Sequence, residues 1–428
     1  MALCALRHAR RPLLLGTVAL ILLLTLSACG RTPAPTLLET PAAPGASLPR
    51  LSVDPDGLAW LSWVEPAEDG HVLRFSRFQG GGWLEPQTAA EGRDWFVNWA
   101  DFPSVVHLGS GHMAAHWLQK VDGGPYAYHV KMAVSTDAGA NWSAPRAPHA
   151  DESATEHGFV TLFPHPEGVG AAWLDGRHTL PVGNGQHREE HGHDGNPEPD
   201  AHHHGHGEGP MTLRAGGLDW DGARLPETEL DPMTCDCCPT AAAETSTGIV
   251  VLYRDRTPEE IRDIRAVVLG PDGWSAPALV GDDGWEMPAC PVNGPAVAAR
   301  GEHVAAAWFT AAKGVPRIRL AFSTDGGHSW GPAIDVADGP VVGRVAVVMP
   351  DADSAVVSWL EQSRMRAEIR FRRVGQDGRT GAPYKLATTV AARSSGFPQM
   401  TLAGDQLLFA WTAVGDPSSV RTAIAPVP

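Results

Sequence analysis

Four cysteines outside the first 29 residues are the side chains best suited to chemistry. Cys235, Cys237 and Cys238 fall within four residues, and Cys290 follows later, just before a Pro-Val-Asn-Gly-Pro run. Thiolates and thioethers are soft ligands that suit Cu(I), and Met233 stands two residues before the first of these cysteines. The same residues could form disulfide bonds, including one from Cys290 to one of the three, or a redox-active thiol pair. The sequence therefore predicts a copper or zinc site, with structural disulfides as the alternative.

Histidines are concentrated in one insertion at about residues 178–209, which holds eight of the 19 in the chain. Imidazole is a common ligand for Zn, Cu and Ni, and a tract of this composition indicates metal binding. Gly and Pro between the histidines predict a loop, so a solvated loop that binds metals only adventitiously is the alternative. A loop that captures metal and delivers it to the thiols is a coherent hypothesis. Its predicted ligands are His191, His193, His202, His203, His204 and His206.

An aromatic residue that recurs about every 50 residues predicts the fold that positions these groups. Each aromatic follows an apolar strand and a turn and is followed by two further strand-like segments, which is typical of a four-stranded propeller blade. The one longer interval contains the histidine-rich insertion. The count predicts an all-β propeller of seven blades, with six as the alternative. The recurring residues are Trp63, Trp117, Trp173, Tyr253, Trp308, Trp359 and Trp411.

The last repeat ends after its third strand, and residues 36–40 near the N-terminus could supply the fourth and close the ring. Because strands within a blade alternate in direction, the loops between second and third strands share one face with the links between blades. That face is expected to carry the four cysteines and the histidine-rich insertion.

Two turns on the opposite face share the pattern Ser-x-Asp-x-Gly-x-x-Trp. The Asp can accept backbone N–H groups in a tight turn, and the Gly can supply a positive φ. The pattern resembles the Asp box, or BNR repeat, of the sialidases. This resemblance implies a sialidase-like propeller in which the boxes are structural and lie away from the active face. The box residues are Ser135, Asp137, Gly139, Trp142, Ser323, Asp325, Gly327 and Trp330.

The resemblance also implies where a sialidase-type site would lie. Sialidases hold the substrate carboxylate with three arginines and use a tyrosine nucleophile with a Glu partner and an Asp as acid and base. The matching candidates on the loop-rich face are Arg177, Arg254 and Arg344, with Asp175 and Asp255 beside two of them. Structural ion pairs at the mouth of the ring are the alternative. The Phe/Tyr-Arg-Ile-Pro signature of the family is missing, and the four tyrosines offer no evident nucleophile.

The start of the chain predicts export and lipid attachment. A basic segment and a short apolar run lead to Leu-Ser-Ala-Cys29, which resembles a bacterial lipobox with Cys29 as the lipidated residue. Residues 1–29 are therefore the signal peptide, 30–47 a Pro/Ala-rich linker and 48–428 the propeller. We expect a monomer anchored in the cell envelope, on the outer membrane, facing the periplasm or the surface.

Composition limits the classes of function. The net charge of −16 argues against a nucleic-acid partner, because such proteins need basic surfaces. The leading prediction is an envelope propeller whose Cys/His-rich face binds metal, copper first. The alternatives are a glycoside hydrolase of exo-sialidase type and a scaffold that binds a glycan or an envelope protein and uses its cysteines only for disulfides.

Overall fold

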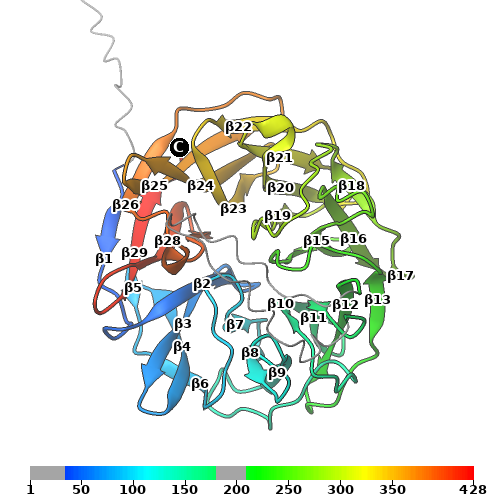
Figure 1. Cartoon of the computed structure of the whole chain (residues 1–428). Helices are drawn as coiled ribbons and strands as arrows, with labels where there is room; N and C mark the ends of the chain where they lie inside the picture. Colours follow the sequence, from blue (N-terminus) through cyan, green and yellow to red (C-terminus); the bar gives the residue numbers. More distant parts are fainter. Residues whose placement is uncertain (1–33, 180–208) are drawn as a thin grey trace, which may run out of the picture. The chain divides into compact units, whose positions relative to one another are not determined.

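The computed structural model describes residues 34–179 and 209–428, which form seven antiparallel sheets arranged as blades around a central axis (Figure 1). The predicted seven-bladed propeller is confirmed, and the six-bladed alternative is wrong.

The first blade comprises β2 (Ser47–Val53), β3 (Ala59–Ala67), β4 (Gly70–Gln79), β5 (Gly82–Trp83) and β6 (Gln87–Gly92). The second comprises β7 (Ser104–His107), β8 (Met113–Lys120) and β9 (Tyr128–Ser135). The third comprises β10 (His157–His165), β11 (Gly168–Asp175), β12 (Thr212–Asp219) and β13 (Thr228–Asp231).

The remaining four blades complete the ring. The fourth comprises β14 (Ala241–Thr245), β15 (Gly248–Arg254), β16 (Ile264–Gly270), β17 (Gly273–Trp274) and β18 (Ala278–Gly281), and the fifth β19 (Ala296–Arg300), β20 (His303–Thr310), β21 (Arg317–Ser323) and β22 (Ile334–Asp338). The sixth comprises β23 (Val341–Asp351), β24 (Ser354–Ser363), β25 (Arg366–Gly375) and β26 (Tyr384–Thr389). The seventh comprises β27 (Gln399–Ala403), β28 (Gln406–Ala413) and β29 (Ser419–Pro426), together with β1 (Thr36–Leu38) from the start of the described chain. Two short 3₁₀ turns, η1 (Ala312–Gly314) and η2 (Arg393–Ser395), interrupt the loops.

The recurring aromatic residue lies on the second strand of every blade and is at most 5% exposed. Three of the tryptophans donate their indole N–H to an acid two residues later: Trp63 to Glu65 at 2.7 Å, Trp173 to Asp175 at 2.8 Å and Trp359 to Glu361 at 3.1 Å. A buried indole needs such an acceptor. In these three blades the aromatic and the acid after it therefore form one structural unit.

The ring closes between the two ends of the propeller. Strand β1 pairs antiparallel with β29, with Thr36 opposite Ile424 and Leu38 opposite Thr422. The last blade thus takes its outermost strand from the segment that the sequence analysis assigned to it. Pairing covers the edge that β29 would otherwise expose.

The two Ser-x-Asp-x-Gly-x-x-Trp turns adopt the same geometry. In the first, the Ser135 hydroxyl donates to Asp137 at 2.9 Å and accepts from the Gly139 N–H at 3.0 Å, and Asp137 accepts the Asn141 N–H at 2.8 Å. Gly139 has a φ of 84°, and Trp142 packs against Phe75 of the neighbouring blade. The second turn repeats these bonds with Ser323, Asp325, Gly327 and Ser329, and there Trp330 donates to the Gly327 carbonyl.

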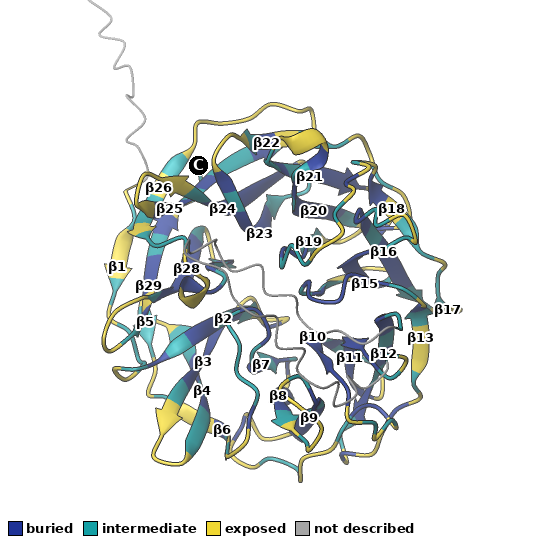
Figure 2. Ribbon diagram, in the orientation of Figure 1, coloured by how far each residue is buried: buried dark blue, intermediate teal, exposed yellow. Residues whose placement is uncertain are grey.

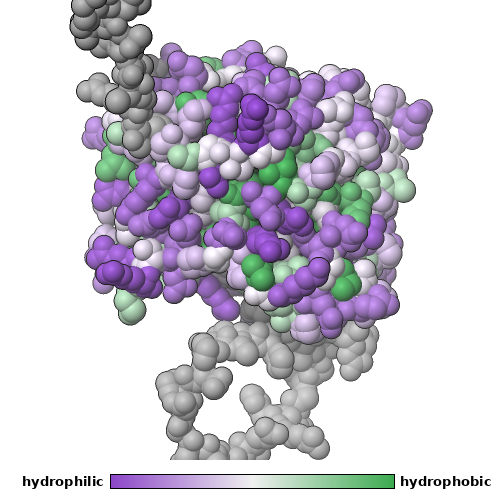
Figure 3. All heavy atoms as spheres, turned by 90° about the horizontal axis from the view of Figure 1, so that it is seen from above, coloured by the Kyte–Doolittle hydropathy of each residue, from purple (hydrophilic) through white to green (hydrophobic). Residues whose placement is uncertain are grey.

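The core lies between blades and within them rather than at the centre of the ring. Figure 2 shows buried second and third strands and an exposed outer rim. The side of the propeller seen in Figure 3 is mostly hydrophilic, with apolar residues scattered among polar ones. Within the described ranges, no helix has the length and apolar character needed to cross a bilayer.

Candidate metal and thiol site

The four cysteines come together on the links of two neighbouring blades. Cys235, Cys237 and Cys238 lie between β13 and β14, and Cys290 lies between β18 and β19. The backbone N–H of Cys235 donates to the Arg254 carbonyl at 3.0 Å, which holds the first link against the end of β15. The first three thiols are buried, at 0%, 6% and 1% exposure, whereas Cys290 is half-buried.

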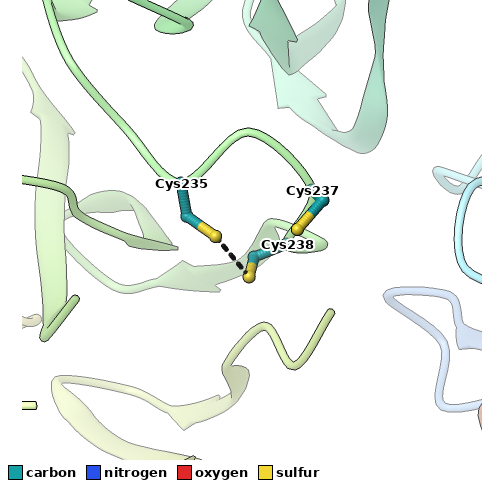
Figure 4. Close-up of side chains that lie close together, drawn as sticks. All are labelled: Cys235, Cys237 and Cys238. Carbon is teal, nitrogen blue, oxygen red and sulfur yellow. Dashed lines mark hydrogen bonds between the residues drawn. The ribbon is translucent and has the colours of Figure 1, made fainter. Parts of the chain in front are cut away.

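The sulfur atoms form one cluster (Figure 4). The Sγ atoms of Cys235, Cys237 and Cys238 all lie within 4.8 Å of one another, and those of Cys235 and Cys238 are 2.6 Å apart. Cys237 is disulfide-bonded to Cys290, with a Cα–Cα distance of 6.0 Å. The predicted bridge from Cys290 to one of the three is confirmed, and Cys235 and Cys238 remain as thiols.

Two arginines, Arg262 and Arg254, lie near the free thiols. Burial would raise the pKa of Cys235, but its contact with Cys238 and the charge of Arg262 outweigh burial and lower that pKa to about 7. Burial and the neighbouring Cys235 raise the pKa of Cys238. Arg262 is only 3% exposed, and its Nη1 is buried without a hydrogen-bond partner in the described part of the chain. One thiol of the pair is thus prepared to ionise while the other keeps its proton.

The other predicted metal ligands are placed only in part. Met233 is half-buried on the same link, and its backbone N–H donates to Asp231 at 2.9 Å. The six histidines predicted in the insertion lie outside the described residues, as does Cys29. His178, at the start of the insertion, is half exposed and its Nε2 lies 3.9 Å from Glu229.

The candidate arginines have structural partners. Arg254, at 1% exposure, donates to the carbonyl oxygens of Asn293, Arg262 and Phe309 at 2.6 to 2.9 Å. Its guanidinium also lies 4.9 Å from the ring centre of Trp285. This side chain joins the loops of the fourth and fifth blades and has no surface left for a substrate.

Arg344 and Arg177 occupy two other places on the ring. Arg344 is 5% exposed, donates to the carbonyls of Ala392 and Gly396, and lies 4.7 Å from the ring centre of Trp99. Burial, and then the charge of Arg393, lower the pKa of Arg344 to about 10. Arg177 instead forms ion pairs with Asp175 and Glu227 in the third blade.

The two candidate carboxylates have structural partners. Asp175 accepts the Trp173 indole and both Nε and Nη2 of Arg177, and lies 3.7 Å from His157 Nε2. Asp255 stands two residues after Tyr253 and pairs with Arg265. This is the same spacing from the aromatic as for Glu65, Asp175 and Glu361 in three other blades. The alternative of ion pairs at the mouth of the ring therefore describes Asp175 and Asp255 better than an acid–base role.

A tyrosine that the sequence analysis passed over has the partners that a nucleophile would need. The Tyr128 hydroxyl lies 2.6 Å from Glu156 and 3.1 Å from Asp101, and all three residues are buried. Burial raises the pKa of Asp101 to about 7 and that of Glu156 to about 8, although their hydrogen bonds with Tyr128 lower both. These groups line a small cavity of about 30 Å³ that also contacts Trp99 and Cys237.

Comparison with known proteins adds only a likeness of fold. No protein-family profile matches the chain, and no curated protein matches it. The Hadza microbial sialidase Hz136 is 14% identical over 86% of this chain and 76% of its own, with a TM-score of 0.45. A PL25 polysaccharide lyase, an ulvan lyase, is 10% identical over 92% and 94%, with a TM-score of 0.49. Trypanosoma rangeli sialidase is 11% identical over 81% and 56%, with a TM-score of 0.43.

Proposed function

We propose that this protein is an envelope-anchored propeller that binds a soft metal ion, Cu(I) before Zn(II), at Cys235, Cys237, Cys238 and Cys290. The observation that carries the proposal is the convergence of three buried sulfurs from one loop within 4.8 Å, with the fourth bonded to one of them. Among the described residues this is the single group of three or more Cys, His, Asp or Glu ligand atoms so close together. Thiolate ligands select Cu(I) and Zn(II) over harder ions.

The surroundings support thiolates as ligands. A buried anionic cluster needs compensating charge. Arg262 and Arg254 are both buried beside the link that carries the cysteines, and the Arg262 charge acts directly on Cys235. These cations would balance the negative charge that several thiolates leave around a monovalent ion.

The disulfide makes this capacity depend on redox state. With Cys237 and Cys290 bonded, only Cys235 and Cys238 can bind as thiolates. Two electrons and two protons from an external dithiol would convert the disulfide to two thiols and the dithiol to its own disulfide. The reduced protein then has four sulfur ligands and the oxidised protein two.

The test is metal and thiol analysis of the full chain carrying Cys29→Ser, loaded anaerobically with Cu(I) or Zn(II) before and after reduction. We expect about one tightly held copper per reduced chain, because a closed set of thiolates binds a single ion. Cys235→Ser should abolish this binding. Deletion of residues 180–208 should slow the uptake of the metal ion and leave the number of ions bound per chain unchanged. Absence of metal in both redox states would exclude the proposal and favour a disulfide-stabilised scaffold.

Lipid attachment requires its own experiment, because Cys29 lies outside the described residues. We expect cells given labelled palmitate to incorporate it into the protein and Cys29→Ser to remove the label. The same variant should appear in the soluble fraction. Equal labelling of both proteins would contradict an anchor at Cys29.

A glycoside hydrolase of exo-sialidase type is the second candidate function, and Tyr128 is the observation that favours it. A phenol held between Glu156 and Asp101 is the pairing that a tyrosine nucleophile requires. The adjacent cavity of about 30 Å³ has room for roughly two water molecules, so a sugar ring would enter only if Trp99 or Arg393 moved. Turnover of a fluorogenic sialoside that is lost in Tyr128→Phe and kept in Tyr384→Phe would support this function. If none of the glycosides tested is hydrolysed, the glycoside hydrolase function is excluded.

A further inference from the structure

The centre of the propeller contains a cavity of about 550 Å³ that is separate from the thiol cluster. The first strands of all seven blades line it, from β2 through β7, β10, β14, β19 and β23 to β27 (Figure 1). Much of this wall consists of small or apolar side chains, such as Ala242, Ala298 and Val347. Charged groups on such a wall therefore need an explanation.

Arg50 on β2 is a cation on this wall that has no counter-ion in the part of the chain that the structure describes. Within residues 34–179 and 209–428, the structure gives its guanidinium no hydrogen bond, and no carboxylate lies within the 4.0 Å of an ion pair. Burial lowers the pKa of Arg50, and no neighbouring acid opposes that effect. Arg50 is half-buried, so its unpaired guanidinium keeps only part of its hydration, and an anion in the cavity would offer it an opposite charge and hydrogen bonds.

Two acids on the wall already have other partners. Asp54 accepts the Trp60 indole and lies 3.2 Å from His107 Nδ1. Asp101 accepts the Phe159 N–H and interacts with Tyr128. Neither is an ion-pair partner of Arg50.

Two further polar groups on the same wall also lack partners. The Ser52 hydroxyl, two residues along β2 from Arg50, and Nε2 of His116 on β8 are buried without a hydrogen bond in the described part of the chain. The other His116 nitrogen, Nδ1, lies 3.0 Å from the Ser104 hydroxyl. If that hydroxyl donates to Nδ1, the hydrogen of the imidazole is on Nε2, which has no hydrogen-bond partner among the described residues.

His116 is neutral and close to Arg50. Burial, and then the charge of Arg50, lower the pKa of His116 to about 3. The imidazole therefore offers a hydrogen bond rather than a second positive charge. One cation with two neutral donors is a set that suits a small anion.

We propose that the central cavity binds a small oxyanion, of carboxylate, phosphate or sulfate type, between Arg50, His116 and Ser52. A guanidinium presents paired N–H groups that match two oxygens of such an anion. The site lies on the first two blades, whereas the cysteines lie on links of the fourth and fifth, so it does not depend on the proposed metal function.

The experiment is isothermal titration of the full chain with acetate, inorganic phosphate, sulfate and chloride, in a buffer whose own anions are bulky sulfonates. We expect at least one of the three oxyanions to bind and to raise the melting temperature. Arg50→Met should weaken that binding by at least about tenfold. Arg300→Met is the matched control, because Arg300 also lines the cavity but is exposed, and it should bind like the wild type.

Stability separates loss of the site from loss of the fold. Without oxyanion, Arg50→Met should melt no lower than the wild type, since it removes an unpaired charge. Ser52→Ala, a milder change, should weaken binding by a smaller factor. Binding that is unchanged in Arg50→Met, binding of chloride alone, or no binding by the wild type would each overturn the proposal.

Discussion

Arg254 donates from Nε, Nη1 and Nη2 to three main-chain carbonyl oxygens at 2.6 to 2.9 Å while only 1% of the side chain is exposed. Replacement by Met would leave those three buried acceptors without donors, at a cost of about 1–3 kcal/mol each. We predict that Arg254→Met lowers the free energy of unfolding by at least about 3 kcal/mol. Urea unfolding measures this loss. Arg366→Met, at an exposed position on β25, is the control and should change stability by less than about 0.5 kcal/mol.

The carboxyls beside Tyr128 make stability depend on pH. Burial raises the pKa of Asp101 to about 7 and that of Glu156 to about 8, so the folded protein retains protons that the unfolded chain releases near pH 4. Stability should therefore fall as pH rises from about 4 to about 8, by up to about 1.4 kcal/mol per pH unit for each group, and then level off.

Glu156→Gln, which keeps a neutral side chain at every pH, isolates this effect. Urea unfolding at pH 5 and pH 8 should show a smaller loss of stability in this variant than in the wild type. Glu244→Gln, at an exposed position on β14, should keep the wild-type difference. An equal loss in all three proteins would show that Glu156 does not hold a proton in the fold.

At the scale of the structural elements, the sequence could predict the repeating strands of the blades. It could not predict which side chains come into contact between the loops that link the blades. The period of Trp63, Trp117 and the later aromatics defined the blades because one buried ring is needed in each second strand. The acid two residues after the aromatic was also visible in Glu65 and Glu361, and it could have identified Asp175 as structural.

Contacts that involve the loops between blades depend on where the folded ring places each loop. Glu156 meets Tyr128 because the strand-like link that follows the second blade returns beside β9 and forms a parallel bridge at these two residues. In the same way, three pairings of the cysteines were open until the ring brought Cys290 to Cys237. The three arginines could be assigned to one face by alternation of the strands. The partners of Arg254 and Arg344 are mainly main-chain carbonyl oxygens, which no residue type in the sequence identifies, whereas Arg177 pairs with the carboxylates of Asp175 and Glu227.

The Asp-box turns permit a test of packing between blades. Gly139 has a φ of 84°, and a Cβ there would lie 2.5 Å from Cζ of Phe75 in the neighbouring blade. Gly57 has a similar φ of 79° but nothing within 4 Å of its Cβ position. We predict that Gly57→Ala costs about 1 kcal/mol for backbone strain and that Gly139→Ala costs about 1–3 kcal/mol more because of the clash. Equal losses on thermal unfolding would show that the neighbouring blade accommodates the methyl group.

At the scale of the whole propeller, the two proposed sites and the structural turns lie in different parts of the ring. Its centre carries Arg50, a cation with no counter-ion among the described residues, and the links that lead into the fourth and fifth blades carry the sulfur cluster. The Asp boxes stabilise hairpins on the other side of the blades. Because every blade packs on two others, a site on one link depends on the whole ring remaining closed.

Closure itself rests on the strand β1, and two adjacent leucines allow it to be tested. Leu38 packs into the apolar cluster between the last and first blades, with Trp63 and Leu408, whereas Leu37 is 64% exposed. Leu38→Ala should therefore lower the free energy of unfolding by about 1–2 kcal/mol, somewhat less than for a fully buried leucine. Leu37→Ala, with the same change on the opposite side of β1, should cost less than about 0.5 kcal/mol. If both variants unfolded at the wild-type urea concentration, β1 would add no stability, and the ring would be held closed by the packing of the first blade against the last alone.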